Sequence, residues 1–309
     1  MKNFLSAIAL FALLVTSACI HAASTPQGLA KDLQAALDKG DFTAARKLAD
    51  IGDAPAELHF FYLDSVRECA GEATCTVATA AASDELRQQL KAQAAQLHAQ
   101  VPDVDGMITI AVKSKDGSGS GSLKMPYAKV GSDYKIASIH YSPAEFATLR
   151  ARTDDALVQE LFAAGIRDDH GELKTDWAKT AAKLPADGGD AGKAFVAQTR
   201  AMSAAVDAKN PDAAMHSGGK MAEIVFRDKG FDGKVIPQVD RQRKLYVQAL
   251  RMLRDVKIKG GYVLGNDAVL LIEARNGIGW TVRGPILLSR DGDAWERAGD
   301  HMVSYPAGT

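Results

Sequence analysis

The chain has 309 residues, of which 47% are hydrophobic and 24% are charged, and its formal net charge is −1. This composition is typical of soluble globular protein and argues against a disordered chain or a membrane bundle, while the length favours about two domains. Because the charge is close to neutral and no basic stripe occurs, we expect no nucleic-acid partner.

The N-terminal residues have the pattern of an export signal. Lys2 supplies a positive start, residues 4–15 are apolar, and small residues follow at 16–24. The apolar stretch is too short to span a bilayer as a mature helix. We therefore interpret residues 1–22 as a secretory signal peptide, which places the mature chain in the periplasm or cell envelope.

Two processing routes fit this leader. Signal peptidase would cut after Ala22 or Ala23, where small residues occupy the cleavage site. Alternatively, residues 17–19 resemble the end of a bacterial lipobox, and Cys19 would then be lipidated, although Thr16 replaces the usual aliphatic residue. A lipid on Cys19 would be the protein's sole expected contact with a membrane, since no later segment has the ~20 apolar residues that a span needs.

The two remaining cysteines, Cys69 and Cys75, lie close together in the sequence ECAGEATC. In an oxidising compartment such a pair predicts a local disulfide, and the alternative is two free thiols. A metal site would need further ligands nearby, and we expect no metal ion or cofactor.

The first half of the mature chain reads as helices followed by an antiparallel meander. Helical spacing and capping residues predict helices at 27–41, 42–52 and 83–100, with another apolar-faced segment at 57–71. β-Branched and alternating residues then predict strands at 106–114, 123–130 and 134–141, with a flexible Gly/Ser hairpin tip at 115–122. These elements predict a first α+β domain at residues 23–143.

The second half repeats this plan after a helical connector at residues 144–189. Helices are predicted at 194–210, 211–225 and 240–256, and strands at 267–276, 280–290 and 294–303. We therefore predict a second α+β domain at residues 190–309.

A shift of 161 residues lays residues 107–141 on 268–302 without a gap. The positions of strands and turns agree, and each half ends in a Gly-x-x-aromatic hairpin followed by a histidine. The hairpins are VGSDYKIASIH at 130–140 and DGDAWERAGDH at 291–301. This agreement favours duplication of one fold.

Helices followed by a curved antiparallel sheet that ends in Gly-x-x-aromatic-Lys-Ile resemble the nuclear-transport-factor-two-like superfamily. This is the SnoaL-like, cystatin-like cone fold. Residues 131–136, GSDYKI, are the closer match, and residues 292–297, GDAWER, keep the glycine and the aromatic residue. The resemblance implies two similar cone domains, each with a pocket between a helix and the concave face of its sheet. A common version of the cone has an early strand hairpin, which the sequence at 50–80 does not indicate.

Three residues are weak candidates for catalysis. His140 and His301 occupy equivalent positions at the ends of the two halves, where a neutral imidazole could act as a general base. Asp300 cannot easily orient His301, because adjacent strand residues face opposite sides. Glu273 shares a strand face with apolar residues, which would raise the pKa of its carboxyl as an acid catalyst needs. The alternative is that all three are ordinary residues near strand ends.

Other signals for chemistry are weak. The sequence has no nucleophile elbow, zincin motif, P-loop or EF-hand loop. The cluster RDDHGE at residues 167–172 contains metal-ligand residue types but reads more readily as a solvated loop. We therefore expect a non-catalytic exported module that binds another protein, for example an immunity or inhibitor protein that neutralises a toxin in the envelope. The alternatives are an enzyme of isomerase, dehydratase or cyclase type that uses Glu273 and His301, and a carrier of a small apolar ligand in a cone pocket.

Overall fold

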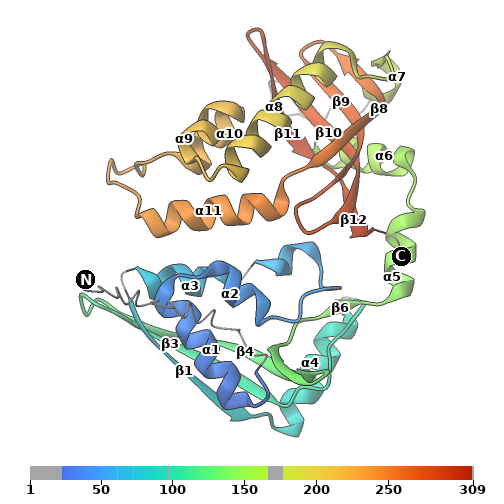
Figure 1. Ribbon diagram of the computed structural model, residues 1–309. Coiled ribbons are helices and arrows are strands. Elements are labelled where there is room, and N and C mark those ends of the chain that lie inside the picture. Colours follow the sequence, from blue (N-terminus) through green and yellow to red (C-terminus); the bar gives the residue numbers. More distant parts are fainter. Residues whose placement is uncertain (1–22, 61, 72, 97, 166–176, 308–309) are drawn as a thin grey trace, which may run out of the picture.

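The computed structural model of the chain describes residues 23–60, 62–71, 73–96, 98–165 and 177–307. These residues form a four-stranded sheet from the first half and a six-stranded sheet from the second, with helices on both (Figure 1). The pairings within both sheets are antiparallel. The predicted α+β class, with helices packed on curved antiparallel sheets, is therefore confirmed.

The first half begins with helices and ends with strands. Its elements in chain order are α1 (Pro26–Lys39), α2 (Phe42–Lys47), a 3-10 turn (Ala56–His59), α3 (Leu63–Ala70), β1 (Ala73–Ala81), α4 (Asp84–Gln96), β2 (Ala99–Gln100), β3 (Gly106–Ser114), β4 (Ser120–Val130), β5 (Asp133–Ile136) and β6 (His140–Tyr141).

The first sheet has the strand order β1-β3-β4-β5, and its core lies between the sheet and α1. Alternate residues of β3, Ile108 and Ile110, are buried on the face that receives Leu29, Leu33 and Leu37 from α1. The spacing of these three leucines brings them to one side of the helix, so the helix and the sheet exclude water from each other.

Cys69 at the end of α3 and Cys75 in β1 form a disulfide, which confirms the predicted pairing. The S–S distance is 2.03 Å and both residues are buried. The bond fixes β1, an edge strand, to the helical layer that precedes it.

The segment after the first sheet does more than connect the halves. It contains α5 (Pro143–Ala151), α6 (Asp154–Gly165), α7 (Trp177–Thr180) and the short strand β7 (Ala182–Leu184), which pairs with the second sheet. Residues 182–184, which lie within the predicted helical connector, thus belong to the second sheet.

The second half again places helices before strands. Its elements are α8 (Gly189–Asp207), α9 (Pro211–Ser217), α10 (Gly219–Phe226), α11 (Gln238–Arg251), β8 (Arg254–Leu264), β9 (Asp267–Arg275), β10 (Trp280–Asp291), β11 (Ala294–Asp300) and β12 (Val303–Pro306). The strand order is β11-β10-β9-β8-β7, and β12 pairs with the first residues of β10.

The offset of 161 residues holds in the structure for the meander. Both bounds of β9 lie 161 positions after those of β3, and the first residue of β11 lies 161 positions after that of β5. The turns before β5 and β11 use Gly131 and Gly292, whose φ angles are 63° and 59°. A positive φ is costly for a residue with a Cβ, so the turn explains the glycine at both positions.

Several expected boundaries are wrong. The helix expected at 240–256 ends at Arg251, where the N–H of Met252 bonds the carbonyl of Gln248, and β8 starts at Arg254. Likewise, the helix expected to reach residue 100 ends at Gln96, before β2. Strands β1 and β8 were not expected from the sequence pattern.

The expected last strand of each half is broken in two. In the first half, β6 leaves the sheet and pairs with β2. In the second half, β11 follows β10 through residues 286–291, whereas β12 pairs with residues 280–283 of the same strand. The backbone therefore bends between the two pieces, near His301.

Helix α11 lies between the two halves and contributes to both cores (Figure 1). Its Val247 belongs to the core of the first half, and Leu245 to a cluster among the helices of the second. Two ion pairs also join α11 to α3: Arg243 lies 2.8 Å from Asp64, and Asp240 lies 3.2 Å from Arg67.

Candidate functional site

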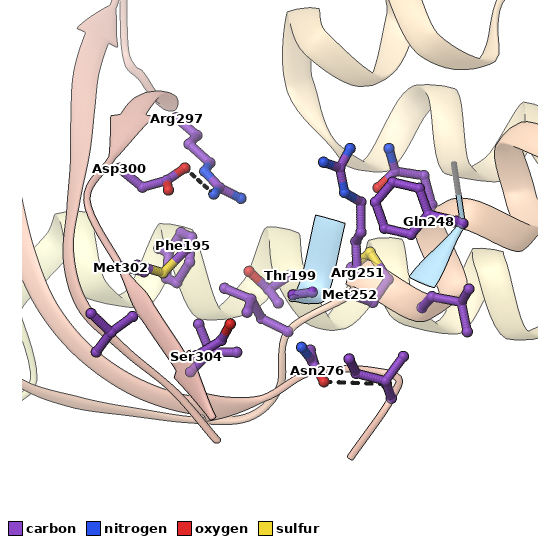
Figure 2. A pocket seen from close by; sticks show the side chains of 17 residues that line it. Phe195, Thr199, Gln248, Arg251, Met252, Asn276, Arg297, Asp300, Met302 and Ser304 are labelled. Carbon is purple, nitrogen blue, oxygen red and sulfur yellow. Dashed lines mark hydrogen bonds and ion pairs between the residues drawn. The ribbon is translucent and has the colours of Figure 1, made fainter. Parts of the chain in front are cut away.

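A groove lies mainly between α8, α10, α11 and β11 of the second half, and its larger part also reaches β12 and Ala56 and Phe60 of the first half. It consists of two adjoining hollows of about 470 Å³ and 360 Å³, which share five lining residues. The shared residues are Phe195, Thr199, Gln248, Met252 and Arg297. Figure 2 shows the first hollow, with side chains from the helices facing side chains from the end of the sheet.

The smaller hollow exposes mainly apolar surface, the larger one is more polar, and three methionines line the two. Met202 lies in the smaller hollow, Met302 in the larger, and Met252 in both, and Phe195 stands beside them. Methionine is unbranched and polarizable, so such a surface adapts to the shape of what it binds. The groove is therefore suited to receive apolar groups of several shapes.

The charged groups of the groove are already engaged with neighbours. Arg297 and Asp300, three positions apart on β11, form an ion pair that Figure 2 shows at the rim. The guanidinium of Arg251 lies 4.6 Å from the ring centroid of Phe60, which is a cation–π contact between the halves. These groups shape the rim of the groove and can orient a bound polar group.

His301 does not line the groove, although its neighbours Asp300 and Met302 do. Its Nε2 lies 2.5 Å from a carboxylate oxygen of Glu160 on α6, and Glu160 also pairs with Arg152. The contacts with Arg152 and His301 lower the pKa of Glu160. As expected, Asp300 does not orient His301, and the acid that does so comes from 141 residues away.

His140 lies in the first half, on β6, and contacts Asp50 at 3.2 Å. The hydrogen bond to His140 is the main cause that lowers the pKa of Asp50, and burial opposes it. The pair joins β6, which follows the first sheet, to the loop after α2. The structure thus gives each of the two histidines a different carboxylate partner.

Glu273 lies on β9, where its carboxylate is 2.7 Å from the ammonium of Lys259 on β8. The pKa of Glu273 is lowered, chiefly by the hydrogen bond to Lys259 and further by other nearby cations. The expectation of a raised pKa for Glu273 is wrong, because Lys259 lies beside it on β8, a strand that the sequence pattern did not predict. A carboxylate held ionised in this way is a poor proton donor at neutral pH.

Neither the groove residues nor the two acids, Asp50 and Glu160, were expected from the sequence to belong to a site. Within the described part of the chain, no cluster of three or more potential metal ligands occurs. The candidate cluster at 167–172, the leader at 1–22 and Cys19 lie outside the described residues. Among the helices that are described, none is long and apolar enough to cross a bilayer.

Comparisons with known proteins return little. No protein-family model matches the chain, and no curated protein matches it. One solved structure that it resembles weakly is a cystatin-like protein from Ruminococcus gnavus, at 12% identity, with 89% of this chain and 82% of that chain covered and a TM-score of 0.20. That score is too low for the likeness to bear on fold or function.

Proposed function

We propose that this chain is an exported, non-catalytic binding protein whose partner is another protein. The observation that carries the proposal is the open, methionine-lined groove between α8, α10, α11 and β11. A groove of this kind accepts the apolar face of a partner's helix or extended segment. Each fully buried Leu or Phe side chain of the partner would contribute about 1.5–3 kcal/mol.

Export rests on the leader at residues 1–22, and the Cys69–Cys75 disulfide supports it. Disulfides persist in oxidising compartments such as the periplasm and are rare in the cytosol. Cleavage after Ala22 or Ala23 would free the chain, whereas lipidation of Cys19 would tether it to the envelope membrane.

We also propose that the two halves arose by duplication of a cone-like, nuclear-transport-factor-two-like unit. The offset of 161 residues between β3 and β9 supports this proposal, and so do the similar backbone turns that precede α2 and α9. Gly40 and Lys209 have φ angles of 63° and 53°, and the next residues, Asp41 and Asn210, cap the following helices.

Within this class, the biological role that we propose is that of an immunity or inhibitor protein. An exported chain that binds an envelope-acting toxin or effector would neutralise it by blocking the surface through which the toxin acts. The apolar lining of the smaller hollow, together with rim charges that already have partners, supports binding as the function of the groove.

The test is affinity capture from the envelope of the source bacterium, with the wild-type chain, Met252→Glu and Ile224→Glu. Met252 lines both hollows, whereas Ile224 is exposed on α10 and lines neither, so the two variants carry the same kind of change. We expect a stoichiometric protein partner with the wild type and with Ile224→Glu, and its loss with Met252→Glu. Circular dichroism of all three controls for folding. Absence of any stoichiometric partner, or its retention by Met252→Glu, would refute the proposal.

A second candidate is a carrier of a small apolar ligand, which the smaller hollow favours because its exposed lining is mainly apolar. Native mass spectrometry of the chain purified from its source would then show a retained molecule that Met252→Glu lacks. A retained ligand without a protein partner would favour the carrier.

A further inference from the structure

The loop between α10 and α11, residues 227–237, forms a small hairpin that projects beyond the ends of the neighbouring helices (Figure 1). We call it the α10–α11 hairpin. The N–H of Gly230 bonds the carbonyl of Lys234 at 2.7 Å, and the N–H of Ile236 bonds that of Asp228 at 2.7 Å. These bonds hold the tip in one conformation, so a partner would lose little entropy in binding it.

The hairpin exposes large apolar side chains. Phe231 at its tip is 87% exposed and Val235 is 73% exposed, and these two are the most exposed large apolar residues among those the structure describes. Arg227 stacks on Phe231, with its guanidinium carbon 3.4 Å from the ring centroid. An aromatic side chain held out in this way, with an arginine on its face, has the composition of an interface anchor.

A hollow of about 480 Å³ adjoins the hairpin and is lined by four cations: Arg67, Lys234, Arg243 and Lys244. Two carboxylates, Asp232 and Asp240, also line it, but each is already paired. Asp232 lies 3.4 Å from Lys234, and Asp240 lies 3.2 Å from Arg67.

Two cations beside this hollow, Lys244 and Arg227, are not paired with a carboxylate among the described residues. Arg243 is paired with Asp64, but neither Lys244 nor Arg227 has a carboxylate within 4.0 Å among the described residues. Burial lowers the pKa of Lys244, and the nearby Arg227, Arg241 and Arg243 lower it further, against the opposing effect of Asp240. The hollow therefore has a positive potential that a carboxylate from outside would relieve.

We propose that the α10–α11 hairpin and its cationic hollow form a docking site for an acidic segment of a partner protein. Carboxylates of the segment would enter the hollow beside Lys244, and an apolar residue next to them would cover Phe231 and Val235. The cations alone would suit any anion, but the apolar tip requires an apolar counterpart, which a peptide supplies. This inference rests on the proposed function, because it takes the partner to be a protein, but it uses a surface apart from the groove.

The test is selection of a displayed library of random 12-residue peptides on the full mature chain. The selected peptides are then measured by fluorescence anisotropy against Lys244→Glu, Phe231→Ser and the control Lys124→Glu. Lys124 is exposed on β4, far in sequence from the hairpin, and receives the same change of charge. We expect enrichment of Asp or Glu beside aromatic or aliphatic residues. Binding should weaken at least tenfold in Lys244→Glu and in Phe231→Ser, stay unchanged in Lys124→Glu, and weaken in high salt.

Enriched peptides without an excess of acidic residues, or equal binding by Lys244→Glu and wild type, would overturn the inference. The inference would also be overturned if no peptide bound and phosphatidylglycerol vesicles bound in a way that depends on Phe231, because the surface would then be a lipid-binding surface. The outcome is separable from that of the proposed function. A captured partner that is lost in Met252→Glu but kept in both Lys244→Glu and Phe231→Ser leaves the proposed function standing and removes this inference.

Discussion

The ion pair between Arg283 on β10 and Asp154 on α6 should contribute more to stability than any other ion pair of the second half, because Arg283 is nearly buried. Its residue is 9% exposed, and its guanidinium donates to Asp154 at 2.9 Å, to the carbonyls of Arg150 and Arg152, and to the hydroxyl of Tyr305 at 3.3 Å. It thus joins the sheet to the junction of α5 and α6. Replacement by Met keeps the volume of the side chain but leaves these acceptors without their donor.

The expected cost of Arg283→Met follows from these contacts. Breaking a buried ion pair costs about 3–5 kcal/mol, and since the side chain of Asp154 is 32% exposed to water, we expect the lower end, about 3 kcal/mol. For a cooperative unit of this size, that loss lowers Tm by roughly 6–12 °C. Urea unfolding followed by tryptophan fluorescence measures it, because Trp280 on the same strand packs on Phe146 of α5 at 5.5 Å.

Arg290→Met is the matched control, because Arg290 lies on the same strand but is exposed and only stacks on Trp295 at 4.9 Å. We expect it to cost no more than about 1 kcal/mol. If Arg283→Met costs less than about 1 kcal/mol, or no more than Arg290→Met, then the buried contacts of Arg283 do not hold the α5–α6 junction to the sheet.

Three other predictions concern stability. Replacing Cys69 and Cys75 by Ser opens a loop with a sequence separation of 6, which should cost about 2 kcal/mol in urea unfolding, and a variant as stable as the wild type would contradict the disulfide. His140 lowers the pKa of Asp50 below its ordinary 3.8, so the pair of the two residues stabilises the fold at pH values above 3.8. This contribution to the free energy of unfolding is lost as the pH falls through the lowered pKa of Asp50. The stability of Asp50→Asn, measured between pH 2 and pH 6, should therefore vary less with pH than that of the wild type. Gly188→Ala should lower Tm, because φ is 74° and the new Cβ would lie 2.8 Å from a Leu270 methyl, and an unchanged Tm would show that the start of α8 can shift.

The sequence predicts the parts of the fold that depend on local signals. Alternation and glycine turns define β3, β4, β9 and β10 within a few residues, since the side-chain period and the turn chemistry are both local. The disulfide was predictable for the same reason, because its two cysteines are separated by only 6 positions.

The missed strands had weaker signals. β1 consists of alanines, threonines, a valine and a cysteine, so it carries almost no large apolar residue, and its place in the sheet follows from pairing with β3. β8 did carry a detectable signal, since Val256 and Ile258 alternate with Lys257 and Lys259. A helix pattern running into it from α11 concealed that alternation.

The site was less predictable than the fold. Its groove is built by α8, α10, α11 and β11, and residues such as Met202 and Met302 look like ordinary core residues until those elements are placed together. The hairpin tip is different, because Gly-Phe-Asp-Gly at residues 230–233 is a turn with an apolar residue that could have been read as exposed.

The two histidines show how a repeated position can have a structural reason without a shared reaction. His140 lies four residues after the end of β5, and His301 directly follows β11. Each contacts a carboxylate on an earlier segment, Asp50 in the first half and Glu160 of α6 in the second. A histidine is well suited to this place, because one ring nitrogen can meet the carboxylate while the ring packs along the bend. The common feature of the two pairs is that each joins the chain after a meander to an earlier segment, the loop after α2 in the first half and α6 in the second.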